Sequence, residues 1–207
     1  KGSKVVVLGL NGAGKTTLLR MLAGLDQPDT GAVEPGHGLK VGYYAQEHET
    51  LDVSKSVLEN MQRAAPQLAE VDARKVLGSF LFSGDDVNKP AGVLSGGEKT
   101  RLALATLVVS SANVLLLDEP TNDLDIETLE LLESLLTEYQ GTLLLVSHDR
   151  AFIDNTVTSS WWYAGNGHWS EYVGGYQDAV NQGAKFYSEE PSSQKVVEAP
   201  AVETKPV

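Results

Sequence analysis

The sequence predicts an α/β fold with a mostly parallel sheet. Short apolar runs alternate along the chain with segments whose apolar residues recur every three or four positions, which is the order of elements in a doubly wound core. The run 114–117 holds only apolar residues, as expected of a strand buried on both faces of a parallel sheet. A glycine-rich motif between the first apolar run and the first helical segment is also typical of this class.

The same patterns assign the elements in order. We expect strands at 4–8, 39–45, 114–117 and 142–146, and helices at 15–25, 95–109 and 126–139. In the first helix Leu18, Leu22 and Leu25 form one apolar stripe. Two short helices between residues 54 and 82 predict a small helical lobe inserted into the core. Asn166-Gly167 is a strong hairpin-turn signal, and we expect the tryptophans around it to pack against the core: Trp161, Trp162 and Trp169.

The domain organisation follows from these elements. We expect an ATP-binding core in two parts, 1–53 and 94–187, around a helical subdomain at 54–93. Residues 188–207 are rich in Pro, Glu, Ser and Ala without periodicity, which predicts a disordered linker. Because the chain begins with Lys1 and its first strand already carries the glycine-rich motif, we expect it to be a fragment of a longer protein.

Composition limits the classes of partner and compartment. The formal net charge of −12 gives no long-range attraction to nucleic acid or to an anionic membrane. The absence of cysteine excludes disulfides and thiolate metal sites and is compatible with the reducing cytoplasm. No apolar run approaches the roughly 18 residues that span a bilayer. We therefore expect a soluble, cytoplasmic protein.

Residues 9–16 read Gly-Leu-Asn-Gly-Ala-Gly-Lys-Thr and fit the phosphate-loop motif G-x-x-x-x-G-K-[ST]. The glycines let successive backbone N–H groups turn inward and form an anion nest. We expect the Lys15 ammonium between the β- and γ-phosphates and the Thr16 hydroxyl on Mg²⁺. The alternative is a glycine-rich turn that binds no ligand. It is disfavoured because Lys15 and Thr16 occupy the Lys and Ser/Thr positions of the motif. The expected nucleotide-binding residues here are Gly9, Asn11, Gly12, Ala13, Gly14, Lys15, Thr16 and Thr17.

Two acids follow the apolar run 114–117. Asp118 and Glu119 are therefore expected at the carboxyl edge of the sheet, beside the phosphate loop. Asp118 suits the metal-binding role, directly or through water, and Glu119 suits the polarisation of the water that attacks the γ-phosphate. A capping or solvated acid is the alternative for Glu119.

The segment Ser95-Gly96-Gly97-Glu98 supports two interpretations. Ser95 and Glu98 match the capping box S-x-x-E, which marks a well-started helix. The two glycines at a helix start also make a second phosphate-binding element, Ser95 to Glu98. These interpretations do not exclude one another.

Together with Gln46 and His148, these motifs stand in the order of an ATP-binding-cassette nucleotide-binding domain, which the chain resembles from Gly9 to His148. The resemblance implies a P-loop NTPase fold of the ABC type and closure as a head-to-tail pair. In such a pair the serine and glycines of one signature contact the γ-phosphate that the other cassette holds. It also implies that Gln46 senses Mg²⁺ and the attacking water, that Asp125 communicates across the dimer, and that His148 contacts the γ-phosphate.

Three classes of protein share this kind of domain. DNA-maintenance ATPases insert hundreds of residues where this chain has a small lobe, which excludes them. The segments 95–101, 119–125 and 147–154 resemble the corresponding motifs of ABC-F proteins more than those of transporter subunits. Asp123 departs mildly from the ABC-F pattern. Segment 165–178 resembles the end of the second cassette in the Uup-type subfamily.

The resemblance implies binding and hydrolysis of MgATP, to ADP and phosphate, when the domain pairs with a second cassette in the same full-length chain or in a homodimer. It also implies action on the ribosome or ribosomal RNA by the complete protein, with DNA binding only through regions outside this chain. The alternatives are the ATPase subunit of an ABC transporter and a nucleotide-gated binding module with little turnover.

Overall fold

The computed structural model describes residues 2–45, 51–122 and 124–187, which form a six-stranded sheet in the order β2-β3-β4-β1-β5-β6. The first five strands in this order run parallel, and β6 pairs antiparallel with β5. The mostly parallel sheet is therefore confirmed. The strands are β1 (Lys4–Leu8), β2 (Val41–Tyr44), β3 (Val114–Asp118), β4 (Thr142–Val146), β5 (Ser159–Gly165) and β6 (His168–Val173).

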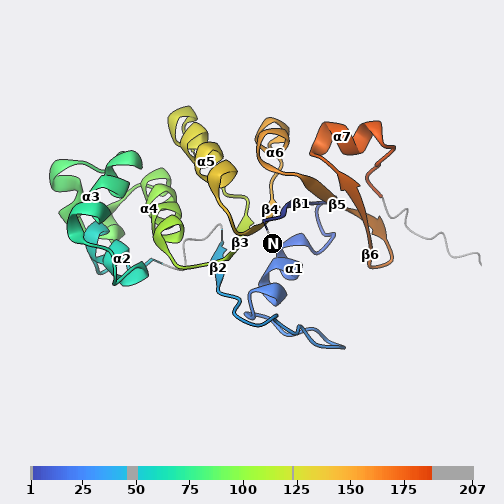
Figure 1. Ribbon diagram of the computed structural model, residues 1–207, viewed down its shortest axis with the longest axis horizontal. Coiled ribbons are helices and arrows are strands. Elements are labelled where there is room, and N and C mark those ends of the chain that lie inside the picture. The colour runs from blue at the N-terminus through green and yellow to red at the C-terminus, as the bar shows by residue number, and fades with distance from the viewer. Residues whose placement is uncertain (1, 46–50, 123, 188–207) are drawn as a thin grey trace, which may run out of the picture.

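Helices cover both faces of the sheet. In Figure 1, α1 lies below the strands, whereas α4, α5 and α6 lie above them. The α-helices are α1 (Lys15–Leu22), α2 (Val57–Ala64), α3 (Glu70–Ser79), α4 (Gly96–Val109), α5 (Ile126–Glu138), α6 (Arg150–Thr156) and α7 (Tyr176–Asn181). Two short 3₁₀ helices lie at Gly84–Asn88 and Ala91–Val93.

The central strands carry uninterrupted apolar runs because they bury both faces. Alternate residues of one strand point to opposite sides of the sheet. Thus Val6 of β1 belongs to the large core cluster that includes Leu132 of α5, whereas Val7 packs in a second cluster with Leu19 of α1 and Leu116 of β3. This two-sided burial accounts for the uninterrupted apolar runs of β1, β3 and β4.

The strand order brings three loops to one edge. β4 lies between β3 and β1, and all three run parallel. Their carboxyl ends therefore meet at the same edge, where open α/β sheets bind ligands. The glycine-rich loop follows β1, Glu119 follows β3, and His148 comes two residues after β4.

The first helix ends earlier than the sequence indicated. α1 stops at Leu22, because Gly24 adopts a φ of 74° and the Gly24 and Leu25 amides donate to the Met21 and Arg20 carbonyls. This is the Schellman arrangement that terminates helices. The predicted stripe is therefore wrong at Leu25, which is 54% exposed, and Leu19 is the fully buried residue of the helix.

The C-terminal hairpin forms as predicted. Asn166 and Gly167 both have positive φ, as a tight hairpin turn requires, and they join β5 to β6. Trp162 is buried against the rings of Tyr176 and Phe186, at centroid distances of 5.5 and 4.7 Å. The other two tryptophans pack against the second core cluster, so the expected packing role is confirmed for all three: Trp161, Trp162 and Trp169.

A helical lobe stands beside the sheet. α2 and α3 pack on each other and on α4, at the left of Figure 1. α2 begins at a capping box, in which Ser56 accepts from the Glu59 amide while the Glu59 carboxylate accepts from the Ser56 amide. The domain boundaries at 54–93 stay a prediction, and the predicted linker at 188–207 lies outside the described residues.

Candidate nucleotide-binding site

The loop after β1 needs its glycines for different reasons. Gly12 and Gly14 have φ values of 87° and 81°, a region that residues with a Cβ seldom adopt. Gly9 is instead limited by space, because a Cβ there would lie 2.9 Å from the Cβ of Ala13 and 3.1 Å from that of Tyr163. The loop can therefore form this compact turn only with glycine at these positions.

Lys15 folds over the loop that precedes it. Its ammonium donates to the carbonyl oxygens of Gly9 and Leu10, at 2.8 and 3.2 Å. Burial lowers the pKa of Lys15, and the charges of Glu119 and Asp118 oppose this effect. The first residue of α1 thus places a cation at the loop and within the field of two carboxylates.

The carboxylates come from the end of β3. Asp118 is the last residue of the strand and is 6% exposed. Glu119 has a φ of 50°, which is uncommon for a non-glycine residue and costs on the order of 1–3 kcal/mol. The Glu119 amide donates to the Val146 carbonyl at 2.9 Å and continues the pairing of β3 with β4 into the strained turn.

Glu119 lies against His148. Glu119 Oε1 is 3.2 Å from His148 Nε2, but without hydrogen-bond geometry, so this buried oxygen has no hydrogen-bond donor in the described part of the chain. Burial raises the pKa of Glu119, although the positive field of His148 and its backbone amide partly offset this effect. Asp118 raises the pKa further, and Lys15 lowers it. A carboxylate with these properties is a stronger base than an exposed glutamate.

These residues surround one cleft of about 380 Å³. The phosphate loop forms one wall, and the ends of β3 and β4 form the other. The lining residues are Asn11, Gly12, Gly14, Lys15, Thr16, Thr17, Asp118, Glu119, Val146 and His148. Gly9 and Ala13 do not line this cleft and lie close to each other within the loop. Gln46, predicted to act here, lies outside the described residues.

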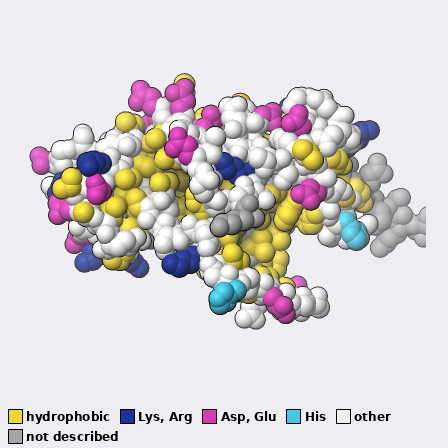
Figure 2. All heavy atoms as spheres, viewed as in Figure 1, with side chains coloured by type: hydrophobic (Ala, Val, Ile, Leu, Met, Phe, Trp, Pro, Cys, Tyr) yellow, Lys and Arg dark blue, Asp and Glu magenta, His cyan; other side chains and the backbone are white. Residues whose placement is uncertain are grey.

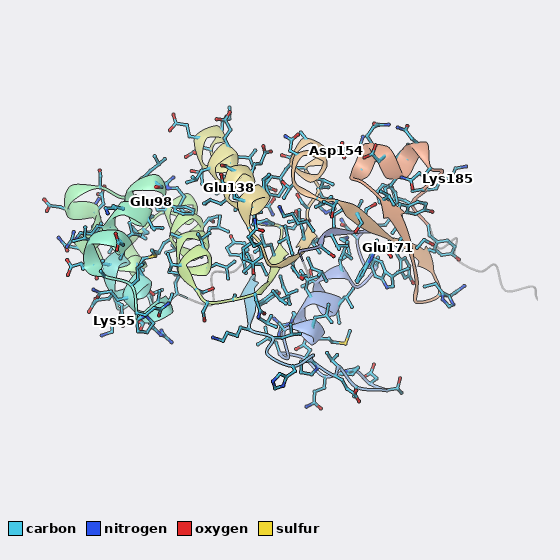
Figure 3. All side chains as sticks on the ribbon, in the orientation of Figure 1. Lys55, Glu98, Glu138, Asp154, Glu171 and Lys185 are labelled. Atoms are coloured by element: carbon cyan, nitrogen blue, oxygen red, sulfur yellow. The ribbon has the colours of Figure 1, made fainter. Side chains whose placement is uncertain are left out.

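The structure does not bring the signature segment to this cleft. Ser95 is the N-cap of α4, and its amide donates to Glu98 Oε2 at 2.8 Å, while the Glu98 amide donates to Ser95 Oγ at 3.3 Å. The capping box is therefore confirmed. None of residues 94–98 lines the cleft, and Figure 3 shows Glu98 beside the helical lobe, apart from α1. Any contact of Ser95, Gly96 and Gly97 with phosphate requires a cleft of another cassette.

The sequence analysis missed Arg101. Its guanidinium donates to Asp125 at 3.2 Å and lies 5.7 Å from the centre of the Phe82 ring. Asp125 also caps α5 by accepting from the Thr128 amide at 2.8 Å. The hydrogen bonds from Thr128, and more weakly the charge of Arg101, lower the pKa of Asp125. The arginine thus ties the signature helix α4 to the start of α5, across a separation of 24 residues that no local pattern reveals.

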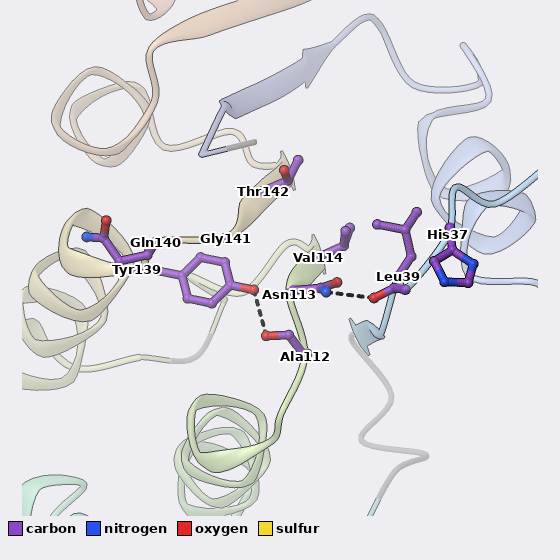
Figure 4. Close-up of a pocket in the computed structure, with 10 residues that line it drawn as sticks. His37, Leu39, Ala112, Asn113, Val114, Tyr139, Gln140, Gly141 and Thr142 are labelled. Atoms are coloured by element: carbon purple, nitrogen blue, oxygen red, sulfur yellow. Dashed lines mark hydrogen bonds between the residues drawn. The ribbon is translucent and has the colours of Figure 1, made fainter.

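A larger cleft lies elsewhere in the described residues. Its volume is about 710 Å³, and it is lined at the amino ends of β3 and β4, opposite the phosphate loop (Figure 4). Within it the Tyr139 hydroxyl donates to the Ala112 carbonyl at 3.0 Å, and the side-chain amide of Asn113 donates to the Gly38 carbonyl at 2.9 Å. Its described lining residues include no Lys, Arg, Asp or Glu. Size alone therefore does not mark the site where the charged motifs meet.

The fold and this site define an ATP-binding cassette. The family model described as ABC transporter matches residues 1–122, so the chain belongs to this family. Among the helices that the structure describes, none has the length and apolar character needed to cross a bilayer.

Curated relatives narrow the class to ABC-F. The chain is 45% identical to the ATP-binding protein Uup of Escherichia coli over 212 residues, which covers 100% of this chain and 33% of that protein. It is 43% identical to the energy-dependent translational throttle protein EttA of Haemophilus influenzae, over 86% of this chain and 33% of that one. Both are ABC-F proteins, and the chain spans about a third of their length.

A solved structure shows the same fold. The archaeal ribosome recycling factor aABCE1, in its complex with the archaeal ribosomal stalk protein aP1, matches with a TM-score of 0.70 at 27% identity. The match covers 88% of this chain and 36% of that one. The chain therefore shares its arrangement of sheet and helices with this recycling factor.

The raised pKa of Glu119 predicts how stability changes with pH. The folded state holds this proton more tightly than the unfolded state, so wild-type stability falls as pH rises from the ordinary glutamate value through the folded pKa. Glu119→Gln removes that loss. In urea unfolding without nucleotide, the variant should be more stable than wild type at pH 7, and the difference should shrink below about pH 4. An equal difference at both pH values would contradict the burial of a charged Glu119.

Proposed function

We propose that the chain is the second nucleotide-binding domain of an ABC-F protein, which binds MgATP and hydrolyses it to ADP and phosphate when it is paired with another cassette. The observation that carries this proposal is the meeting of Lys15, Asp118 and Glu119 at one cleft while Ser95 stays outside it. The proposed catalytic groups thus lie at one cleft and the signature segment lies apart from it, which fits a head-to-tail pair.

The residues at the cleft fit a nucleotide with Mg²⁺. Lys15 supplies a cation for the β- and γ-phosphates, and the loop glycines permit the backbone to approach them closely. Among the described residues no three His, Cys, Asp or Glu side chains form a metal-binding group. This suits Mg²⁺, which commonly takes one or two protein ligands besides phosphate oxygens and water. We assign Thr16 and Asp118 to it, with Gln46 from outside the described residues; when bound, Mg²⁺ neutralises phosphate charge.

Glu119 is proposed as the base. It accepts the proton of the water whose oxygen attacks the γ-phosphorus, as the bond to the β-phosphate oxygen breaks. Its buried Oε1 lacks a donor among the described residues, and its raised pKa favours proton uptake. The strained backbone at Glu119 fits a functional position, because such strain persists where the surroundings enforce it. His148, 3.2 Å away, is proposed to contact the γ-phosphate.

A second cassette is proposed to complete the site. Its segment equivalent to Ser95-Gly96-Gly97-Glu98 then faces the γ-phosphate held by Lys15, and the reverse contact forms at the second site. The Arg101–Asp125 contact supports the proposed role of Asp125 in communication, because it links the signature helix α4 to α5. The partner is either another cassette of the same full-length chain or a second copy of this one.

The names of similar proteins support a ribosomal role for the complete protein. EttA is named a translational throttle, and aABCE1 is titled a ribosome recycling factor. We propose cytoplasmic action on the ribosome or ribosomal RNA, with DNA contact only through regions outside this chain. A transporter ATPase subunit is the second candidate, favoured by the family description alone. Co-purification of the complete protein with ribosomal RNA supports the first, and co-purification with a membrane permease supports the second.

Glu119→Gln tests the proposed base. The amide keeps the shape of the side chain but cannot take the proton, so steady-state ATP hydrolysis by the complete protein should fall by about 100-fold or more. ATP binding should persist, because the phosphate loop is unchanged. Phosphate release and equilibrium binding of radiolabelled ATP measure the two effects. Unchanged hydrolysis would remove Glu119 from the mechanism.

The two capping boxes offer a matched test of the signature. Ser95→Ala and Ser56→Ala remove the same kind of cap, so each should cost about 1 kcal/mol in urea unfolding. Only Ser95 is proposed to meet a phosphate. ATP hydrolysis should therefore fall at least 10-fold in Ser95→Ala and change less than twofold in Ser56→Ala. Equal activity in both variants would leave Ser95 with a capping role alone.

A further inference from the structure

A second cleft adjoins the nucleotide-binding cleft. It has a volume of about 510 Å³ and lies between the phosphate loop, α6 and α7. Its lining residues are Leu8, Gly9, Leu10, Asn11, Ser147, His148, Arg150, Ile153, Tyr176 and Phe186. Asn11 and His148 line both clefts. The two spaces are therefore neighbours that share these two residues as a common wall.

The charges of the two clefts differ. The nucleotide cleft contains the carboxylates of Asp118 and Glu119. Among the described residues, those that line the second cleft include no Asp or Glu, whereas Arg150 gives it a positive charge. This is unusual on a chain of net charge −12, whose acidic side chains are scattered over the face that Figure 2 shows. The second cleft thus offers an anion the cation of Arg150, with no Asp or Glu among its described lining residues.

The cation of Arg150 is held in position by α7. Its guanidinium lies over the Tyr176 ring, 4.4 Å from the centroid. The Gln177 amide donates to Asp154 of α6 at 3.2 Å, and a Cβ on Gly175 would clash with the same Asp154 carboxylate. Arg150 forms no ion pair with any described residue. Stacking on an aromatic face leaves the N–H donors at the guanidinium edge available for an oxyanion.

We infer that the second cleft receives inorganic phosphate as it leaves the nucleotide cleft, with Arg150 as its binding group. The inference rests on the proposed hydrolysis, which supplies this anion. Released phosphate is repelled by the carboxylate of Asp118 and attracted by the cation beyond Asn11 and His148. No bond forms or breaks in this step. The exposed His148 side chain stands at the boundary, so its position governs passage between the clefts.

Arg150→Gln in the complete protein tests this path. Acid quenching measures ATP cleavage, and a fluorescent phosphate-binding protein measures release into solution. Cleavage in a single turnover should stay within twofold of wild type, whereas release should slow at least fivefold. Arg150→Lys, which keeps the charge, should restore part of the rate. Tyr176→Phe keeps the ring beneath the guanidinium and should behave as wild type.

The outcomes separate this inference from the proposed function. Release that keeps pace with cleavage in Arg150→Gln overturns the phosphate path, and so does a parallel loss of both rates. Absence of cleavage in wild type overturns the hydrolysis proposal instead. Should Arg150→Gln fail to fold, wild-type protein can be treated with phenylglyoxal, which modifies guanidinium groups. Inorganic phosphate should protect Arg150 but not Arg74, which lies on the helical lobe; equal modification of Arg150 with and without phosphate overturns the inference.

Discussion

The parallel pairing of β3, β4 and β1 is the constraint on which the site depends. Because these strands run in one direction side by side, their carboxyl ends meet at one edge and bring together groups that are distant along the chain. Lys15, Glu119 and His148 reach one cleft for this reason. Burial on both faces holds these strands inside the fold, where their alternate side chains pack into two separate core clusters. Core packing and catalytic geometry are thus two results of the same strand order.

Glu119 is the residue of the site that lowers the free energy of unfolding. This carboxylate is buried, its φ is positive, and one of its oxygens has no donor among the described residues. Burial makes it a stronger base, and the nearby charges of Lys15 and His148 limit the cost of ionisation. The phosphate loop shows a similar compromise, because Gly9, Gly12 and Gly14 give up side-chain packing for a backbone that approaches a ligand closely. Stability is thus lower at the residues that function requires.

Contiguous motifs made much of this predictable from sequence. The phosphate loop, the acids after β3 and the Ser95–Glu98 capping box each lie within a few residues, so spacing and residue type indicate both structure and chemistry. Contacts between distant segments were not predictable in this way. Arg101 meets Asp125 and Arg150 meets Tyr176 only because the fold packs their helices together. α6 and α7 were missed because helices of seven and six residues show too little periodicity, and Leu25 was misassigned because the Gly24 turn ends α1 early.

The central claim is that each nucleotide site is shared by two cassettes. Mixing a Lys15→Ala chain with a Ser95→Arg chain tests it most directly, with ATP hydrolysis as the measurement. Each variant alone has no intact site in a head-to-tail pair, whereas the mixed pair combines one intact phosphate loop with one intact signature. The account predicts that both variants are inactive alone and that mixing restores up to half of the wild-type rate. Activity in either variant alone, or no activity in a mixture in which the two chains form a dimer, would contradict it.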